Sequence, residues 1–217
     1  NAGAVRRRLE ESGSIFQTSL DTEVFLHLLA QAEGDFEDRL AAACREAQGA
    51  YSLVLMTPRA VYGLRDPNGW RPLVLGRLES GAHVLASESC ALDLLGATML
   101  REVLPGELVK LDSRGMTSRQ LLPAGALKQC IFEHIYFSRP DSVVFGETVD
   151  RVRRRLGHRL AEEQPTDADV VISVPDSSNS IALGYAEQSG LPFELGLIRN
   201  HYVGRTFIHP TQAVRDH

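Results

Sequence analysis

Apolar residues spaced by three or four positions predict helices in the first fifty residues of the chain. Val5 and Leu9 lie four positions apart among arginines and glutamates, which predicts an amphipathic helix over residues 4–12. Similar spacing predicts helices over residues 22–30 and 36–47. Gly13 and Gly49 follow the first and the last of these segments, where a helix commonly ends.

After Gly49, short apolar runs separated by turn-forming residues predict β-strands. The runs AYSLVLM, AVYGLR, PLVLGRL and AHVLAS are typical of an antiparallel meander, in which Asp66-Pro-Asn-Gly69 forms a hairpin turn. GELVKLD and GMTSRQLL predict a further strand pair. Helices followed by adjacent strands indicate an α+β domain, which we expect to occupy residues 1–122.

The pattern changes near residue 123, where Pro123-Ala-Gly-Ala126 predicts a linker before the aromatic segment IFEHIYFSRPDS. Residues 149–163 then predict a charged helix with Val152, Leu156 and Leu160 on one face. The run from Val170 to Val174 is typical of a parallel strand buried on both faces, and a helix and the segment LPFELGLI follow it. This order predicts an α/β domain with a doubly wound sheet over residues 123–217.

Composition narrows the possible functions. Hydrophobic residues make up 43% and charged residues 24% of the chain, as in ordinary globular proteins. The net charge of -5 provides no basic field for a nucleic-acid backbone, so we expect no nucleic-acid partner. No apolar run approaches the roughly 20 residues that span a bilayer, and the first residues lack the apolar core of a secretory signal. We therefore expect a cytoplasmic protein without a membrane partner.

The cysteines and histidines predict no metal site by their spacing. Cys44, Cys90 and Cys130 are tens of residues apart, which suits buried reduced thiols better than a metal knuckle or a disulfide framework. The seven histidines show neither HxH nor HExxH spacing.

The loop Pro175-Asp-Ser-Ser-Asn179 is the first candidate for chemistry. It follows the predicted strand and precedes a helix, where free backbone N–H groups can hold a phosphate oxygen. Asp176 would repel that anion unless Mg²⁺ or a sugar hydroxyl lies between them. The alternative is that Asp176 or Ser178 only caps the helix.

Two further segments are candidates. Residues 199–208 crowd polar donors, including Tyr202 and Arg205, around Gly204, as a mobile lid over a phosphate would; an ordinary solvated loop is the alternative. Asp21 lies at the start of a predicted helix, where an aspartate most often serves as a cap.

Several longer runs resemble the glutamine phosphoribosylpyrophosphate amidotransferases, and the resemblance covers essentially the whole chain. DPNG followed by RPL also occurs in other amidotransferases, but IYFSRPDS, VPDSS and NHYVGRTFI resemble only this family. The matching runs are SIFQTSLDTEV (14–24), GAYSLVLMT (49–57), RDPNGWRPLVLG (65–76), ASESCALDLLGAT (86–98), REVLPGELV (101–109), CIFEHIYFSRPDSVVFG (130–146), DADVVISVPDSS (167–178), IALGYAEQSGLPFELGLIRN (181–200) and HYVGRTFIHPTQAVR (201–215).

The resemblance implies a fold and an activity. Residues 1–122 would be the later part of an Ntn-hydrolase (αββα) glutaminase domain, and residues 123–217 the first part of a type I phosphoribosyltransferase domain with a Rossmann-like parallel sheet. In this family ammonia released from glutamine crosses an internal channel and displaces pyrophosphate from phosphoribosyl pyrophosphate. The product is 5-phosphoribosylamine, the first intermediate of purine biosynthesis. Purine nucleotides acting as feedback inhibitors and a homo-tetrameric assembly are also implied.

The resemblance also assigns roles to residues. Asp21 matches the carboxylate that holds the α-ammonium group of glutamine, and Asp176, Ser177 and Ser178 match the pyrophosphate-binding loop. Ser177 stands at the position associated with Mg²⁺. The remaining candidates are Tyr202 and Arg205 in the loop that closes over phosphoribosyl pyrophosphate, and Cys130, which matches a [4Fe-4S] ligand in one branch of the family.

The same comparison predicts that parts of both active sites are missing from these residues. The family's nucleophile is an N-terminal cysteine, but residue 1 is Asn and the first cysteine is Cys44. The acidic ribose-phosphate loop would follow His217. We therefore expect the chain to be inactive by itself. The alternative function is a non-catalytic phosphoribosyl- or nucleotide-binding regulatory module.

Overall fold

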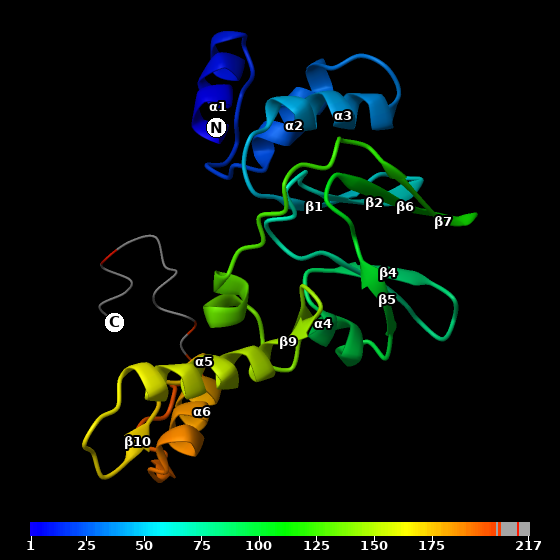
Figure 1. Cartoon of the computed structure of the whole chain (residues 1–217). Coiled ribbons are helices and arrows are strands. Elements are labelled where there is room, and N and C mark those ends of the chain that lie inside the picture. The colour runs from blue at the N-terminus through cyan, green and yellow to red at the C-terminus, as the bar shows by residue number, and fades with distance from the viewer. Residues whose placement is uncertain (203, 205–211, 213–217) are drawn as a thin grey trace. The chain divides into compact units, whose positions relative to one another are not determined.

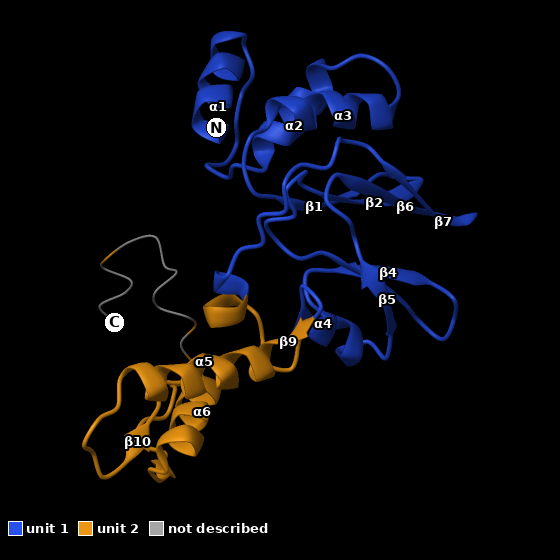
Figure 2. Cartoon of the chain, viewed as in Figure 1, with its two compact units in different colours: residues 1–133, 143–146 blue, residues 134–142, 147–217 orange. Residues whose placement is uncertain are grey.

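The structure is a computed structural model that describes residues 1–202, 204 and 212. It divides into two compact units, coloured separately in Figure 2. Unit 1 comprises residues 1–133 and 143–146, and unit 2 comprises residues 134–142 and 147–217. Each unit is described by itself.

Three helices open unit 1, as the apolar spacing predicts: α1 (Ala2–Glu11), α2 (Glu23–Gln31) and α3 (Phe36–Glu46). Val5 and Leu9 form the buried stripe of α1. Asp35 caps α3 by accepting a hydrogen bond from the Asp38 amide at 2.9 Å. The predicted bounds of the three helices are confirmed to within two residues.

Seven strands form two antiparallel sheets in unit 1 (Figure 1). The four-stranded sheet has the order β1-β2-β6-β7 and the three-stranded sheet the order β4-β3-β5. Their bounds are β1 (Ser52–Met56), β2 (Ala60–Arg65), β3 (Val74–Arg77), β4 (His83–Ala86), β5 (Thr98–Glu102), β6 (Glu107–Asp112) and β7 (Gly115–Gln120).

The predicted meander is wrong at its centre. β1 pairs with β2 and β3 pairs with β4, but the chain crosses from one sheet to the other between β2 and β3. Asp66 to Gly69 therefore forms the turn that joins the sheets and not a hairpin. β5 was not predicted, although it pairs with β3 and completes the second sheet.

Unit 1 has four layers. Successive side chains of a strand point to opposite faces of its sheet, so each sheet can pack against a layer on either side. Leu108 of β6 packs with the residues of α1, α2 and α3, while its neighbour Val109 packs against the other sheet. Leu75 of β3 faces the space between the sheets, while Val74 packs against Leu92 of α4 (Ser89–Leu94). The order is helices, sheet, sheet, helix. Burying each such side chain contributes about 1.5–3 kcal/mol relative to exposure.

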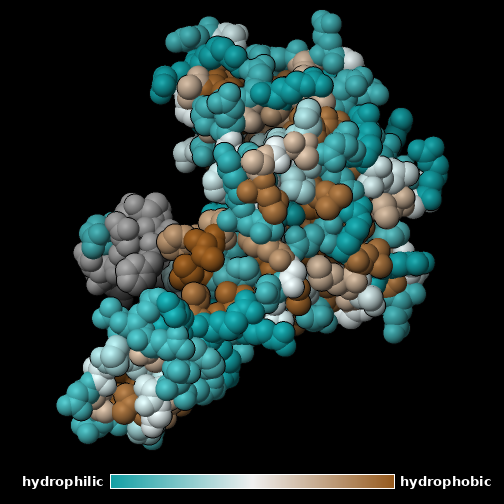
Figure 3. Space-filling model, in the orientation of Figure 1, coloured by the Kyte–Doolittle hydropathy of each residue, from teal (hydrophilic) through white to brown (hydrophobic). Residues whose placement is uncertain are grey.

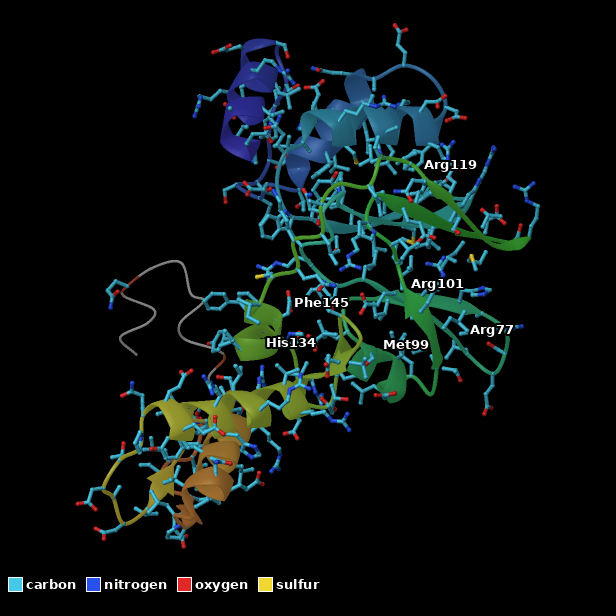
Figure 4. All side chains as sticks on the ribbon, in the orientation of Figure 1. Arg77, Met99, Arg101, Arg119, His134 and Phe145 are labelled. Atoms are coloured by element: carbon cyan, nitrogen blue, oxygen red, sulfur yellow. The ribbon has the colours of Figure 1, made fainter. Side chains whose placement is uncertain are left out.

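A bidentate ion pair also connects the two sheets. Arg101 of β5 donates to both carboxylate oxygens of Glu107 on β6, at 2.7 and 2.8 Å. Arg77, Met99 and Arg101 belong to the β4-β3-β5 sheet and Arg119 to the other sheet (Figure 4). Glu107 is buried, so this pair fixes the register between the sheets as well as compensating a buried charge.

The segment after residue 122 stays with unit 1 for another eleven residues, so the two units divide later than the predicted domain boundary. Backbone amides of Gly125, Lys128 and Cys130 donate to the carbonyls of residues 67, 68 and 70, at 2.8 to 3.1 Å. These bonds attach the expected linker to the turn between the sheets. β8 (Val143–Val144) also belongs to unit 1.

Unit 2 contains the predicted helix–strand pattern. Its elements are η1 (Glu133–Phe137, apart from its first residue), β9 (Glu147–Thr148), α5 (Val149–Glu163), β10 (Val171–Ile172), α6 (Asn179–Ser189) and β11 (Phe193–Glu194). β10 and β11 are parallel, which confirms the predicted β-α-β order. Burial of the first strand on both faces is wrong for the described residues, since Ile172 is 51% and Val174 67% exposed.

The buried face of α5 differs from the predicted one. Val149, Arg153, Gly157 and Ala161 are buried, whereas Leu156 and Leu160 are exposed. The side of α5 visible in Figure 3 is hydrophilic. The cause is the close crossing of α5 and α6, where a Cβ atom on Gly157 would lie 2.0 Å from the Ile181 carbonyl oxygen. Only a glycine permits this approach.

The described helices include none that is long and apolar enough to cross a membrane.

We predict that Gly157→Ala destabilises unit 2 by about 2 kcal/mol or more, because the helices must separate to admit the methyl group. Gly3→Ala in α1 is the matched control, since no atom lies within 4 Å of its added Cβ. That control should be neutral or stabilise by up to about 1 kcal/mol. Urea denaturation measures both, and equal midpoints for the two variants would contradict the prediction.

Candidate functional site

The loop that precedes α2 is held by the side chain of Glu23. Its carboxylate accepts hydrogen bonds from the amides of Gln17 at 2.7 Å and Thr18 at 2.8 Å. The Thr18 hydroxyl donates to the same carboxylate at 2.6 Å. These bonds hold the pKa of Glu23 at about 2, below its ordinary 4.5, with the Gln17 amide as the largest cause and the Thr18 hydroxyl the next.

Asp21 lies in this loop with an exposed carboxylate. Thr22, not Asp21, is the N-cap residue of α2, and its side chain makes no capping hydrogen bond. Within the described residues, no hydrogen bond or ion pair of the Asp21 carboxylate is present. The capping alternative for Asp21 is therefore wrong, and the residue is exposed to solvent.

The second candidate site is a cavity of about 550 Å³ within unit 2. It lies beyond the carboxyl end of β10, where ligands bind in open α/β sheets. Its lining comes from η1 and the segment that follows it, from α5, from the loop after β10 and from the segment after β11: Tyr136, Ser138, Arg139, Pro140, Arg153, Val174, Pro175, Asp176, Ser177, Arg199 and Gly204.

Arg153 is the most buried basic group of this cavity, at 2% exposure. Its Nε donates to the His134 carbonyl oxygen at 2.5 Å and its second guanidinium nitrogen to the Ser138 carbonyl oxygen at 2.9 Å. His134 is labelled in Figure 4. The guanidinium therefore holds the irregular segment before α5 while bringing positive charge to the cavity.

Asp176 and Arg199 form an ion pair at the cavity. One Arg199 guanidinium nitrogen lies 2.5 Å from Asp176 Oδ2, and both side chains are partly exposed. Arg139 pairs with Asp141 at 2.9 and 3.0 Å. Three arginines and one carboxylate thus line a single cavity, and this arrangement suits a polyanion, with the carboxylate available for a cation.

The other predicted residues lie less centrally. Ser177 lines the cavity beside Asp176, but Ser178 does not; its hydroxyl donates to the Val174 carbonyl oxygen. Ser178 is the N-cap residue of α6 without a capping side-chain bond, so the capping alternative is wrong for it. Tyr202 is fully exposed and does not line the cavity. Arg205 lies outside the described residues.

Asp176 and Ser177 offer oxygen donors next to each other, which suits Mg²⁺, because this ion keeps several waters and shares phosphate oxygens with its substrate. Cys130 is half-buried, and among the described residues no group of three His, Cys, Asp or Glu side chains could hold a metal ion. Cys130 would supply one of the four ligands that a [4Fe-4S] cluster needs.

Arg139 and Arg153 line the cavity but were not among the candidates that the sequence predicted. The sequence does carry one signal for Arg153: it stands on the stripe Val149, Arg153, Gly157, Ala161, where spacing by four places a charge among small buried residues. A buried arginine needs acceptors, and loop carbonyls supply them.

Comparison with known proteins agrees with this geometry. Residues 1–94 match the family model described as "Glutamine amidotransferase domain". Over the whole chain, 55% of residues are identical to amidophosphoribosyltransferase 1, chloroplastic, of Arabidopsis thaliana, and 44% to amidophosphoribosyltransferase of Staphylococcus aureus. The chain spans 38% and 44% of those two proteins.

Solved structures give the same result. The glutamine phosphoribosylpyrophosphate amidotransferase from B. subtilis, complexed with ADP and GMP, superposes on the whole chain with a TM-score of 0.88 and 47% identity. The chain covers 48% of that structure's chain. A second structure, of the allosteric regulatory enzyme of purine biosynthesis, gives a TM-score of 0.86, with 46% of its chain covered.

Unit 1 thus has the layers and the sequence of a glutamine amidotransferase domain. Since the relatives match over both units, the chain belongs to the amidophosphoribosyltransferase family.

We predict that the Glu23 carboxyl titrates near pH 2 in the folded chain, against an ordinary value of 4.5. Because its folded pKa is lowered, its contribution to stability is complete above about pH 4.5 and is lost as the pH falls toward 2. NMR titration of the side-chain carboxyl carbon measures this. Thr18→Val, which removes one donor, should raise the pKa, whereas Thr18→Ser should not; a midpoint near 4.5 in the parent chain is the contrary result.

Proposed function

We propose that this chain forms part of a glutamine-dependent amidophosphoribosyltransferase. The enzyme converts phosphoribosyl pyrophosphate and glutamine to 5-phosphoribosylamine, glutamate and pyrophosphate. One observation carries the proposal: Asp176 and Ser177 share a cavity with Arg139, Arg153 and Arg199, where the sequence expects a pyrophosphate. Local positive charge in an acidic chain favours a polyanionic substrate there.

Asp21 supports the glutamine half of the reaction. Its free carboxylate can pair with the α-ammonium group of glutamine, which is the group that distinguishes the amino acid from a simple amide. In this proposal residues 1–122 serve the glutaminase reaction, in an Ntn-hydrolase domain. The nucleophile is a cysteine outside these residues.

The parallel strands β10 and β11 and the covering helices support the synthase half, as part of a type I phosphoribosyltransferase domain. Ser177 and Asp176 would hold Mg²⁺, whose positive charge would offset the repulsion between the carboxylate and the pyrophosphate. Arg199, which pairs with Asp176 in this structure, would also be available to contact a phosphate. Tyr202 and Arg205 remain predicted contacts of the loop that closes over the substrate.

Other properties of the family stay predictions for this chain. They are ligation of a [4Fe-4S] cluster by Cys130, assembly as a homo-tetramer, inhibition by purine nucleotides and a cytoplasmic location. The B. subtilis enzyme is complexed with ADP and GMP, which supports nucleotide binding, whereas several plant relatives are named chloroplastic.

The alternative is a non-catalytic regulatory module that binds a phosphoribosyl group or a nucleotide. Sequencing the DNA on both sides of the coding region separates the two proposals. The enzyme requires an in-frame Cys-Gly-Ile before Asn1 and Asp-Asp-Ser-Ile-Val-Arg-Gly after His217. Genuine start and stop codons at these positions would favour the module.

We predict that the purified 217-residue chain releases no glutamate from glutamine, since its first residue is Asn and supplies no thiolate next to an α-amino base. The product of the complete reading frame should release glutamate, and more rapidly when phosphoribosyl pyrophosphate is present. Turnover by the short chain would contradict this prediction.

We also predict that unit 2 binds pyrophosphate more tightly with Mg²⁺ than without it. Asp176→Asn should reduce the gain in pyrophosphate affinity that Mg²⁺ provides by about tenfold, or about 1.4 kcal/mol. The same substitution should strengthen the binding of pyrophosphate without metal, because it releases Arg199 from its ion pair. Isothermal titration calorimetry measures both affinities. Asp167→Asn changes an exposed aspartate of the same unit that does not line the cavity and should leave both unchanged; an equal effect of the two substitutions would contradict the prediction.

A further inference from the structure

The loop over residues 16–21 is fixed from two sides by charged residues. On one side, Glu23 accepts the hydrogen bonds of Gln17 and Thr18. On the other, a guanidinium nitrogen of Arg6 donates to the carbonyl oxygens of Thr18 at 2.8 Å and Leu20 at 3.2 Å. Glu23 thus holds two backbone amides of the loop and Arg6 holds two backbone carbonyls, and none of these hydrogen bonds involves Asp21.

The Thr18 hydroxyl connects Glu23 to the residue that precedes Asp21. Thr18 Oγ1 donates to Glu23 and accepts a hydrogen bond from the Leu20 amide at 3.2 Å. Leu20 is the residue before Asp21, so the carboxylate of Glu23 fixes the peptide from which the Asp21 side chain projects. The Glu23 side chain is only 13% exposed, as expected for a carboxylate whose hydrogen bonds are made within the protein.

We infer that Glu23 is a positioning residue for glutamine binding: it holds the loop so that the Asp21 carboxylate meets the α-ammonium group of the substrate. This inference rests on the proposed role of Asp21. A loop without the bonds of Glu23 would sample several conformations, and substrate binding would have to order it. Affinity for the amino acid, and selectivity for its ammonium group, would both fall.

A simple structural role for Glu23 is distinguishable from this one. A glutamate in the first turn of α2 also stabilises the helix end, and the His27 ring nitrogen lies 3.7 Å from Glu23 Oε1. Loss of that role lowers the stability of the fold without changing which substrate is preferred. Loss of positioning changes the ratio of kcat/KM for glutamine to kcat/KM for a substrate that lacks the α-amino group.

The test compares Glu23→Gln with its parent in the product of the complete reading frame. Gln keeps the size of the side chain, but its Nε2 places a donor where an acceptor of the Gln17 or Thr18 amide stood. We expect KM for glutamine to rise about tenfold with little change in kcat. Selectivity for glutamine over 4-carbamoylbutanoate, which lacks the α-amino group, should fall by a similar factor.

Three variants serve as controls. Glu33→Gln changes an exposed glutamate after α2 and should leave KM and selectivity unchanged. If Glu23→Gln fails to fold, Thr18→Val removes one bond to the same carboxylate and should raise KM, while Thr18→Ser restores it. Hydrogen exchange of the Gln17 and Thr18 amides should accelerate in Glu23→Gln.

The outcomes separate the inference from the proposed function. If Asp21→Asn raises KM but neither Glu23→Gln nor Thr18→Val changes KM or selectivity, the positioning role is overturned and the role of Asp21 stands. If Asp21→Asn changes nothing, Asp21 is not the glutamine ligand and both ideas fail. A fall in stability with unchanged selectivity assigns Glu23 to the fold alone and also overturns the inference.

Discussion

Hydrogen bonding of loop backbone by charged side chains is the constraint on which both candidate sites depend. Peptide groups withdrawn from water need partners, and a loop has no strand or helix ladder to supply them. Glu23 accepts two amides before α2, and Arg153 donates to two carbonyl oxygens before α5. Arg65 donates to the carbonyl oxygens of Gly69, Arg71 and Val103 in the turn between the sheets. These bonds restrict the conformations that each loop can adopt.

The layered core of unit 1 gives a rigid support to the loop before α2 and to the turn between the sheets. The neighbouring residues Leu108 and Val109 lie on opposite faces of one strand. One face of this sheet therefore packs against the helices, and the other face packs against the second sheet. The buried pair of Arg101 and Glu107 then joins the sheets at their ends. A loop anchored to such a scaffold can hold a free carboxylate like that of Asp21 at a defined position.

The cavity of unit 2 shows how an acidic chain can favour an anion. The net charge of -5 repels anions at long range, but screening limits such fields to about 8–10 Å at physiological salt. Among the residues that line the cavity, Arg139, Arg153 and Arg199 outnumber Asp176. Asp176, the proposed ligand of the metal, pairs with Arg199 in this structure, so the proposed metal binding would exchange one partner for another.

Periodicity along the sequence determined the helices, most of the strands and the parallel order of β10 and β11, because the spacing of apolar residues reports which face of an element leaves water. The sequence also singled out Asp21, Asp176 and Ser177 as candidate site residues through their runs of neighbours. Only the tertiary structure decided which face of α5 is buried, that β2 and β3 lie in different sheets, and that Arg153 lines the cavity. These features depend on contacts between elements, such as Gly157 against the Ile181 carbonyl, and no local pattern encodes the distance between two segments that meet only after folding.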